Sequence, residues 1–71
     1  MSAVSHPSHY NKGGIECIEA IKASMSKEAF LGGLKFNVIK YIWRYESKEK
    51  PLEDLEKARF YLDRLIEEIK S

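Results

Sequence analysis

The chain has 71 residues, and its 12 lysines and arginines nearly balance 11 aspartates and glutamates, for a formal net charge of +1. This balance argues against a polybasic nucleic-acid-binding arm and an acidic tail, and the length excludes a second domain. A chain of this size buries only about 60% of the surface that it exposes when unfolded. We therefore expect a thin core and self-association as the source of extra stability.

One cysteine and short apolar runs exclude further classes of protein. Cys17 alone cannot form an intramolecular disulfide, and we expect it to pack as a small apolar residue. The apolar runs are at most three residues long, far below the roughly 20 residues of a membrane-spanning helix. Residues 1–8 lack the basic and apolar segments of a secretory signal. We therefore expect a cytoplasmic protein without a membrane partner.

The N-terminal part of the chain predicts an arm and a short helix. Residues 1–14 are rich in glycine, proline and serine and show neither helical nor strand periodicity, which indicates an arm. Apolar residues then recur at helical spacing, so we expect a first helix over residues 15–25. Ser26 would cap a short helical turn, which the Gly32-Gly33 pair would interrupt or kink.

The longest helix is expected over residues 34–48, and its apolar residues fall on two sides. One side carries Leu34, Val38, Tyr41, Ile42 and Tyr45. The other side carries Phe36, Ile39 and Trp43. Between the two sides, within about 80° of one another, lie Asn37, Lys40, Arg44 and Lys48.

A last helix is expected over residues 51–70, with Pro51 in its first turn, where the missing N–H costs nothing. Glu53 and Asp54 follow, where the helix dipole favours carboxylates. Its apolar residues recur every three or four positions, as along a helix that packs against another; they are Leu52, Leu55, Ala58, Leu62, Leu65 and Ile69. No segment has strand periodicity, so we expect one all-α domain over residues 1–71, built from a helical hairpin, a short N-terminal helix and an arm.

The cationic row formed by Lys40, Arg44 and Lys48 is the most informative feature of the sequence. Its spacing of four residues aligns three positive charges along one helix, and Asn37 extends the row with a donor and an acceptor. Tyr41 lies beside the row, and aromatic rings next to cations can stack a base while the cations hold its phosphate. A solvated helix face is the alternative interpretation. The pattern favours a nucleotide-binding site.

The last helix offers a second, mixed row. Asp54, Lys57, Tyr61 and Arg64 lie at helical spacing along one edge of the apolar residues. The row is either an edge of ordinary ion pairs or part of the same ligand site. Asp54 would then hold a magnesium ion or orient a cation of the first row.

The arm contributes His6, His9 and Tyr10, which could close over a ligand by hydrogen bonding to phosphate or stacking on a base. A disordered tail is the alternative. With no matching Cys/His pair elsewhere, we expect no metal site. Neither glycine pair is followed by the lysine of a Walker-type loop, so phosphate transfer would need another architecture. No residue is identified as catalytic.

Four motifs occur in order along the chain: His6-Pro-Ser-His9-Tyr10, then Gly14-Ile-Glu, then Asn37-Val-Ile-Lys40-Tyr-Ile-Trp-Arg44-Tyr, then Asp54-Leu-Glu-Lys57-Ala-Arg-Phe-Tyr61-Leu. Over residues 5–67 this combination resembles the small bacteriophage proteins called SaV-like, a family that includes a kinase acting on deoxynucleoside monophosphates. The resemblance implies a phage-encoded, all-α, oligomeric protein associated with nucleotides, located in the cytoplasm of the host cell. The family often has glycine immediately before the asparagine, where this chain has Phe36.

Self-association follows from the two-sided central helix. An exposed apolar patch would be formed by Phe36, Ile39, Trp43 and Phe60, which lies off the apolar row of the last helix. Such a patch predicts contact with another copy of the chain. We expect a homo-oligomer that binds a nucleotide, or a cyclic oligonucleotide signal, at subunit junctions and withholds it from host defence. A nucleoside monophosphate kinase using Mg²⁺ and a module that binds a host protein are the alternatives; a duplex nucleic acid is not expected as a partner.

Overall fold

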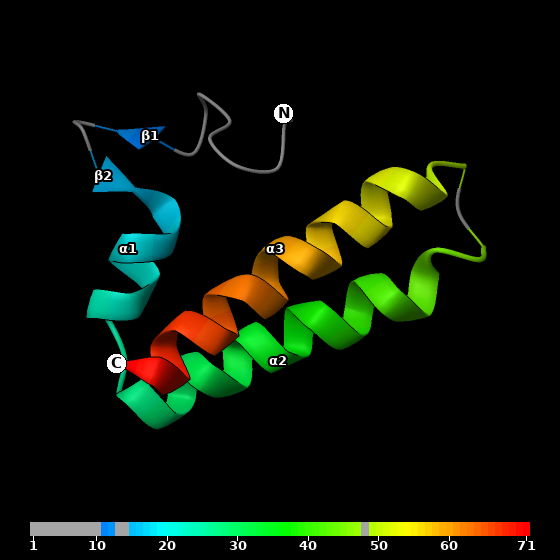
Figure 1. The fold of residues 1–71 in the computed structure, drawn as a ribbon. Coiled ribbons are helices and arrows are strands. Elements are labelled where there is room, and N and C mark those ends of the chain that lie inside the picture. The colour runs from blue at the N-terminus through cyan, green and yellow to red at the C-terminus, as the bar shows by residue number, and fades with distance from the viewer. Residues whose placement is uncertain (1–10, 13–14, 48) are drawn as a thin grey trace.

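The computed structural model describes residues 11–12, 15–47 and 49–71 and confirms an all-α domain. Two short strands, β1 (Asn11–Lys12) and β2 (Ile15–Glu16), precede three helices, which are α1 (Cys17–Ala23), α2 (Lys27–Arg44) and α3 (Pro51–Lys70). The two long helices form an antiparallel hairpin, and α1 lies beside its open end, where α2 begins and α3 ends (Figure 1). Within the described ranges, no helix is long and apolar enough to cross a membrane.

The strands are the first difference from the sequence-based expectation. β1 and β2 pair antiparallel, with Asn11 opposite Glu16 and Lys12 opposite Ile15. Two residues a strand are too few to produce a period of alternating hydrophobicity, so the sequence carries no signal for this ladder. The ladder also delays the start of α1 to Cys17, later than the predicted residue 15.

Helix α1 is short and superficial. It ends at Ala23, where the Ser24 hydroxyl donates a hydrogen bond of 2.8 Å to the Ile21 carbonyl. None of its residues is buried. Cys17 is exposed, so the expectation that it packs as an apolar residue is wrong. The helix must therefore be held in place by something other than apolar burial.

The two ends of α2 are set by hydrogen bonds. The Ser26 hydroxyl accepts a bond of 3.1 Å from the Ala29 N–H, which confirms the predicted cap. The helix ends at Arg44, before the predicted residue 48, because the Ser47 N–H and hydroxyl both donate to the Arg44 carbonyl, at 3.2 and 3.4 Å. Lys48 lies outside the described residues.

The predicted interruption at Gly32-Gly33 is wrong, because α2 runs through both glycines without a break. A glycine costs only about 1 kcal/mol relative to alanine inside a helix. Phe30 and Leu34 flank the pair and are both buried, so the packing of this turn against α3 outweighs that cost. A Cβ at either glycine would meet nothing within 4 Å, so the packing of the chain itself does not require them.

Helix α3 has the bounds expected from the sequence, with Pro51 in its first turn and Glu53 and Asp54 close behind. Its apolar residues do not all face inward, however. Ala58 is buried and Leu65 is half-buried, whereas the other members of the predicted row are exposed, namely Leu52, Leu55, Leu62 and Ile69. The hairpin turns α3 so that Asp54 and Ala58 face α2, and this rotation leaves most of the row outside.

The core is as thin as the chain length predicts. Among the described apolar residues, only Phe30, Leu34 and Ala58 are buried. Two carboxylates, Asp54 and Glu68, are buried beside them. A charged side chain is buried only where it is paired, so these two acids mark the places where the hairpin depends on ion pairs.

One such place is the ion-pair network that fastens α1 to α3. Arg64 donates from Nη1 and Nη2 to the two carboxylate oxygens of Glu19, at 2.8 and 3.1 Å, and from Nε to Glu68 at 2.9 Å. Lys22 Nζ lies 3.1 Å from the same Glu68 oxygen. Short, two-pronged bonds of this kind are the strongest form of ion pair. The network therefore fastens a helix none of whose residues is fully buried.

The network makes the position of α1 dependent on pH. The hydrogen bond that Glu19 accepts from Arg64 lowers the pKa of Glu19 below its ordinary 4.5. The bonds from Arg64 and Lys22 likewise lower the pKa of Glu68. A lowered carboxylate pKa stabilises the docked state above the unfolded-state value and loses that stabilisation as pH falls through the folded-state value. We expect the docking of α1 on α3 to weaken progressively as the pH falls below about 4.5 and through the lowered folded-state pKa values, seen as α1 amide shifts moving toward those of Glu19→Gln; α1 shifts that stay constant until the whole domain unfolds with acid would contradict this.

Candidate functional site

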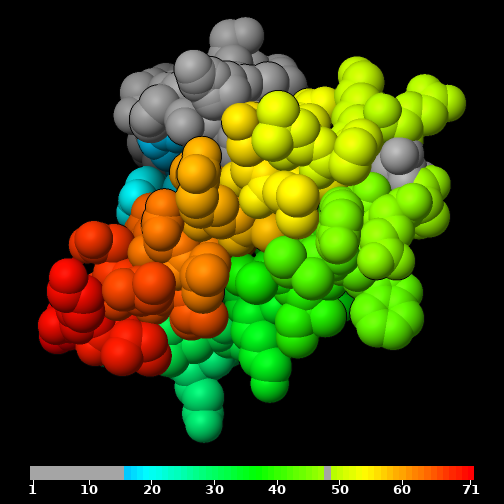
Figure 2. Space-filling model, turned by 45° about the vertical axis from the view of Figure 1, so that its right-hand side comes forward, coloured from blue at the N-terminus to red at the C-terminus, as the bar shows by residue number. Residues whose placement is uncertain are grey.

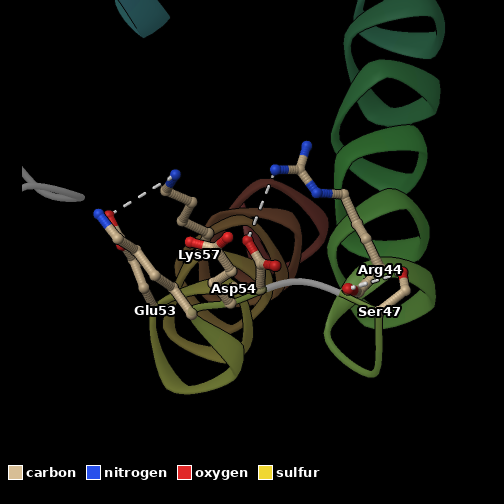
Figure 3. Close-up of a pocket in the computed structure, with 7 residues that line it drawn as sticks. Arg44, Ser47, Glu53, Asp54 and Lys57 are labelled. Carbon is tan, nitrogen blue, oxygen red and sulfur yellow. Dashed lines mark hydrogen bonds and ion pairs between the residues drawn. The ribbon is translucent and has the colours of Figure 1, made fainter.

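The second place with a buried carboxylate is a cleft at the end of the hairpin where α2 and α3 are connected. It has a volume of about 480 Å³ and is lined by Arg44, Ser47, Glu49, Lys50, Glu53, Asp54 and Lys57. Figure 3 shows Arg44 reaching from α2 toward Asp54 on α3, with Lys57 and Glu53 on the same side. The cleft thus combines side chains from both long helices.

Three cations converge on one aromatic ring beside this cleft. Lys40 Nζ lies 4.7 Å from the centroid of the Tyr41 ring, the Arg44 Cζ 5.2 Å and Lys57 Nζ 5.4 Å. Tyr61 stacks parallel to the same ring, with centroids 6.0 Å apart. A cation is attracted to the face of an aromatic ring, but three like charges around one ring repel each other unless anions lie between them.

The carboxylates available to these cations pair with them only loosely. Arg44 lies 3.8 Å from Asp54, and Lys57 lies 3.8 Å from Glu53. Both separations exceed hydrogen-bond length, unlike the bonds of 2.8 to 3.1 Å in the Arg64 network. No carboxylate within the described ranges pairs with Lys40. The positive charge of this region is therefore incompletely neutralised.

Two buried polar atoms of the cleft have no hydrogen-bond partner among the described residues. They are Nε of Arg44 and Oδ2 of Asp54, and the Asp54 residue is only 3% exposed. Leaving a buried donor or acceptor unpaired costs about 1–3 kcal/mol, so native proteins seldom do it without a reason. The Arg44–Asp54 pair thus leaves one buried donor and one buried acceptor unpaired within the described residues.

The structure brings together six of the residues that the sequence suggested as ligand-binding. Lys40, Tyr41, Arg44, Asp54, Lys57 and Tyr61 lie around the cleft and the shared ring. Asn37 is one turn away and donates from Nδ2 to the Gly33 carbonyl at 3.2 Å. His6, His9, Tyr10 and Lys48 lie outside the described residues.

An exposed apolar edge adjoins the same cations. Phe36, Ile39 and Trp43 are 67%, 52% and 84% exposed. With Lys40 and Arg44 they line a groove of about 410 Å³ on the outer side of α2. Trp43 therefore presents a free aromatic surface within reach of two positive charges.

The fourth residue of the predicted patch behaves differently. Phe60 is half-buried, and its ring packs edge-on against Tyr61 at 5.1 Å and 83°. Phe60 is therefore not the fully exposed member of the patch that the sequence led us to expect. Its neighbour in sequence supplies that contact, since the helix brings the two rings together at this point.

Some residues of the site were missed by the sequence analysis. Ser47 and Lys50, from the connection between the helices, and Glu53, from the first turn of α3, also line the cleft. No local pattern marks them, since their proximity to Arg44 depends on how α3 packs on α2.

In the described part of the chain, no three His, Cys, Asp or Glu side chains are grouped as metal ligands would be.

Comparison with known proteins places the chain in a family. The chain is 42% identical over 64 residues to the "Gene 1.7 protein" of Enterobacteria phage T3; the match covers 84% of this chain and 39% of the length of that relative. No solved structure matches. The family described as "protein of unknown function (DUF3310)" matches residues 4–63, most of the chain. The chain thus belongs to the DUF3310 family, and the T3 protein that it resembles is a bacteriophage protein.

Proposed function

We propose that this chain binds a nucleotide, or a nucleotide-derived signal including cyclic ones, between subunits of a homo-oligomer and sequesters it during phage infection. The observation that carries the proposal is the convergence of Lys40, Arg44 and Lys57 on the Tyr41 ring with only loose carboxylate partners. Phosphate is the anion that satisfies clustered Lys and Arg side chains best, since it accepts several charge-assisted hydrogen bonds at once.

The aromatic edge supports a nucleotide rather than a bare anion. The Tyr41 ring already contacts Tyr61 and three cations, so it offers little room for a base. Trp43 is exposed next to Lys40 and Arg44 and suits stacking, which contributes about 1–3 kcal/mol per base. A subunit packed on this edge would enclose the base, which is why the site is proposed at a junction.

A kinase is the alternative within the same binding class, in line with the kinase among the SaV-like proteins. It must align donor and acceptor phosphates around Mg²⁺, with Lys40 and Arg44 neutralising the transferred charge. Asp54 would be the metal ligand, and its buried Oδ2 is a suitable oxygen. Sequestration requires fewer groups than transfer, and for this reason we favour it.

A module that binds a host protein is the second candidate. Trp43 is 84% exposed, and aromatic residues of this kind often dominate protein interfaces. In that case the apolar edge carries the binding energy and the cations around Tyr41 contribute little. The two candidate functions therefore differ in which side chains supply the binding energy.

A calorimetric titration of the full chain tests the proposal. The panel contains mononucleotides, cyclic oligonucleotides and pyrophosphate, each with and without Mg²⁺. We expect one nucleotide to bind more tightly than pyrophosphate and to be recovered unchanged. If no member of the panel binds, nucleotide binding is rejected; if a bound nucleotide is phosphorylated in the presence of ATP and Mg²⁺, the kinase replaces sequestration. A monomeric mass at micromolar concentration would reject the junctional site.

A further inference from the structure

One broad face of the hairpin is left uncovered by the described part of the chain. On α3 the exposed apolar residues are Leu52, Leu55, Leu62, Ile66 and Ile69, which are 37% to 69% exposed. With Arg59 they follow one another at alternating steps of three and four residues. This outer row is the heptad pattern of a helix that packs against another helix along its whole length.

The outer row lies opposite the cationic site. Residues two positions apart in a helix lie about 200° apart around it. Leu55 is two positions from Lys57, and Leu62 is two positions from Arg64, so both point away from the cleft and from α1. In Figure 2, α2 and α3 lie side by side across the face toward the viewer, and α1 is seen only at its margin.

Helix α2 supplies a second row on the same face. Ile42, which is 47% exposed, is two positions from both Lys40 and Arg44 and therefore also points away from the cleft. It belongs to a row with the same alternating steps of four and three, made of Leu31, Lys35, Val38, Ile42 and Tyr45. The uncovered face is thus two parallel rows wide.

Both rows are centred at the same level of the hairpin, and the row on α3 is symmetric about its centre. The row on α2 is centred on Val38, and the row on α3 is centred beside Phe60. Arg44 and Asp54 face each other across the hairpin. Six residues back from Arg44 reaches Val38, and six residues on from Asp54 reaches Phe60, so the two centres lie side by side. A single two-fold axis can therefore relate both rows to those of a second copy.

We infer that this face binds a second copy of the chain, forming a four-helix bundle in which each long helix lies antiparallel on its counterpart. Leu52 then meets the partner's Ile69, and Leu55 meets the partner's Ile66. Such isologous contacts, in which each residue pair occurs twice, are those of a closed two-fold dimer. The two cationic sites face outward on opposite sides of the dimer, so the Trp43 edges stay free for further assembly.

Charge and area agree with this occupant. Arg59, the one charged member of the outer row of α3, would lie beside the partner's Asp63, and symmetry repeats the pair. A face two helices wide and 20 residues long measures about 20 by 30 Å. That area approaches the roughly 800 Å² that each partner buries in a specific interface.

Paired cysteines test this arrangement in the full chain with Cys17→Ser. In one chain, Leu52 and Ile69 are 17 residues apart, about 25 Å along the helix, too far for the Cα separation below about 7 Å that a disulfide needs. In the antiparallel dimer, position 52 of one chain lies opposite position 69 of the other chain, so the two sulfur atoms can meet. We expect Leu52→Cys/Ile69→Cys to form a disulfide-linked dimer on mild oxidation, while neither single variant does. Both side chains are exposed, so the substitutions leave the core intact.

Cross-linking and native mass are both measured without a ligand. Absence of the linked dimer in the double variant overturns the inference, as does linkage in either single variant, because a parallel pair would place like residues together. Leu62→Glu, at 44% exposure, is the second variant. It should halve the native mass while helical circular dichroism persists, and Trp43→Ala should retain the pair; an unchanged mass in Leu62→Glu also overturns the inference.

Discussion

Leu34→Ala is expected to destabilise the protein by about 2–5 kcal/mol, the usual cost of replacing a buried leucine with alanine. Leu34 is 2% exposed and is one of three buried apolar residues in the described chain. A domain of 71 residues has a total stability of roughly 4–10 kcal/mol. The substitution therefore removes a large fraction of it, and a substantial part of the variant should be unfolded at 37 °C.

The measurement is the urea midpoint, compared at one protein concentration because self-association also contributes to stability. Ile21→Ala is the matched control, since Ile21 is 43% exposed on α1 and is not one of the buried core residues. Its cost should stay below about 1 kcal/mol. Equal midpoints for Leu34→Ala and the control would show that the core lies elsewhere.

Lys40→Gln with Arg44→Gln is expected to weaken nucleotide binding by more than about 2 kcal/mol, or roughly 30-fold. Two charge-assisted hydrogen bonds to phosphate disappear, while the glutamine side chains keep their polar character. Glutamine is chosen for position 44 because alanine would remove every polar group of the side chain that lies 3.8 Å from the buried Asp54. The affinity is measured by the same titration on the full chain.

Lys27→Gln with Lys70→Gln is the matched control, because it removes the same two charges at exposed positions away from the cleft. It should leave the affinity within about twofold, since exposed charges at a distance are largely screened by salt. If both pairs weaken binding equally, the ligand responds only to net charge. If neither pair does and Trp43→Ala abolishes binding to a host protein, the interaction module is the correct function.

Much of the fold follows from local patterns in the sequence. The cap at Ser26, the position of Pro51 and the extent of α3 depend on residues within one helical turn, and the structure has them as expected. The two glycines of α2 illustrate the limit of such reasoning. Their local cost is real, but the burial of Phe30 and Leu34 decides the outcome.

The sequence by itself determined which side chains share a helix face, because the helix rotates about 100° per residue whatever surrounds it. Lys40, Arg44 and the exposed edge around Trp43 were therefore visible in advance. Only the tertiary structure decided how α3 is turned against α2. That rotation places Lys57 and Asp54 beside the cationic row of Lys40 and Arg44. It likewise joins Glu19 to Arg64 across 45 residues. These relations depend on which faces pack, and a thin core leaves several faces to choose from.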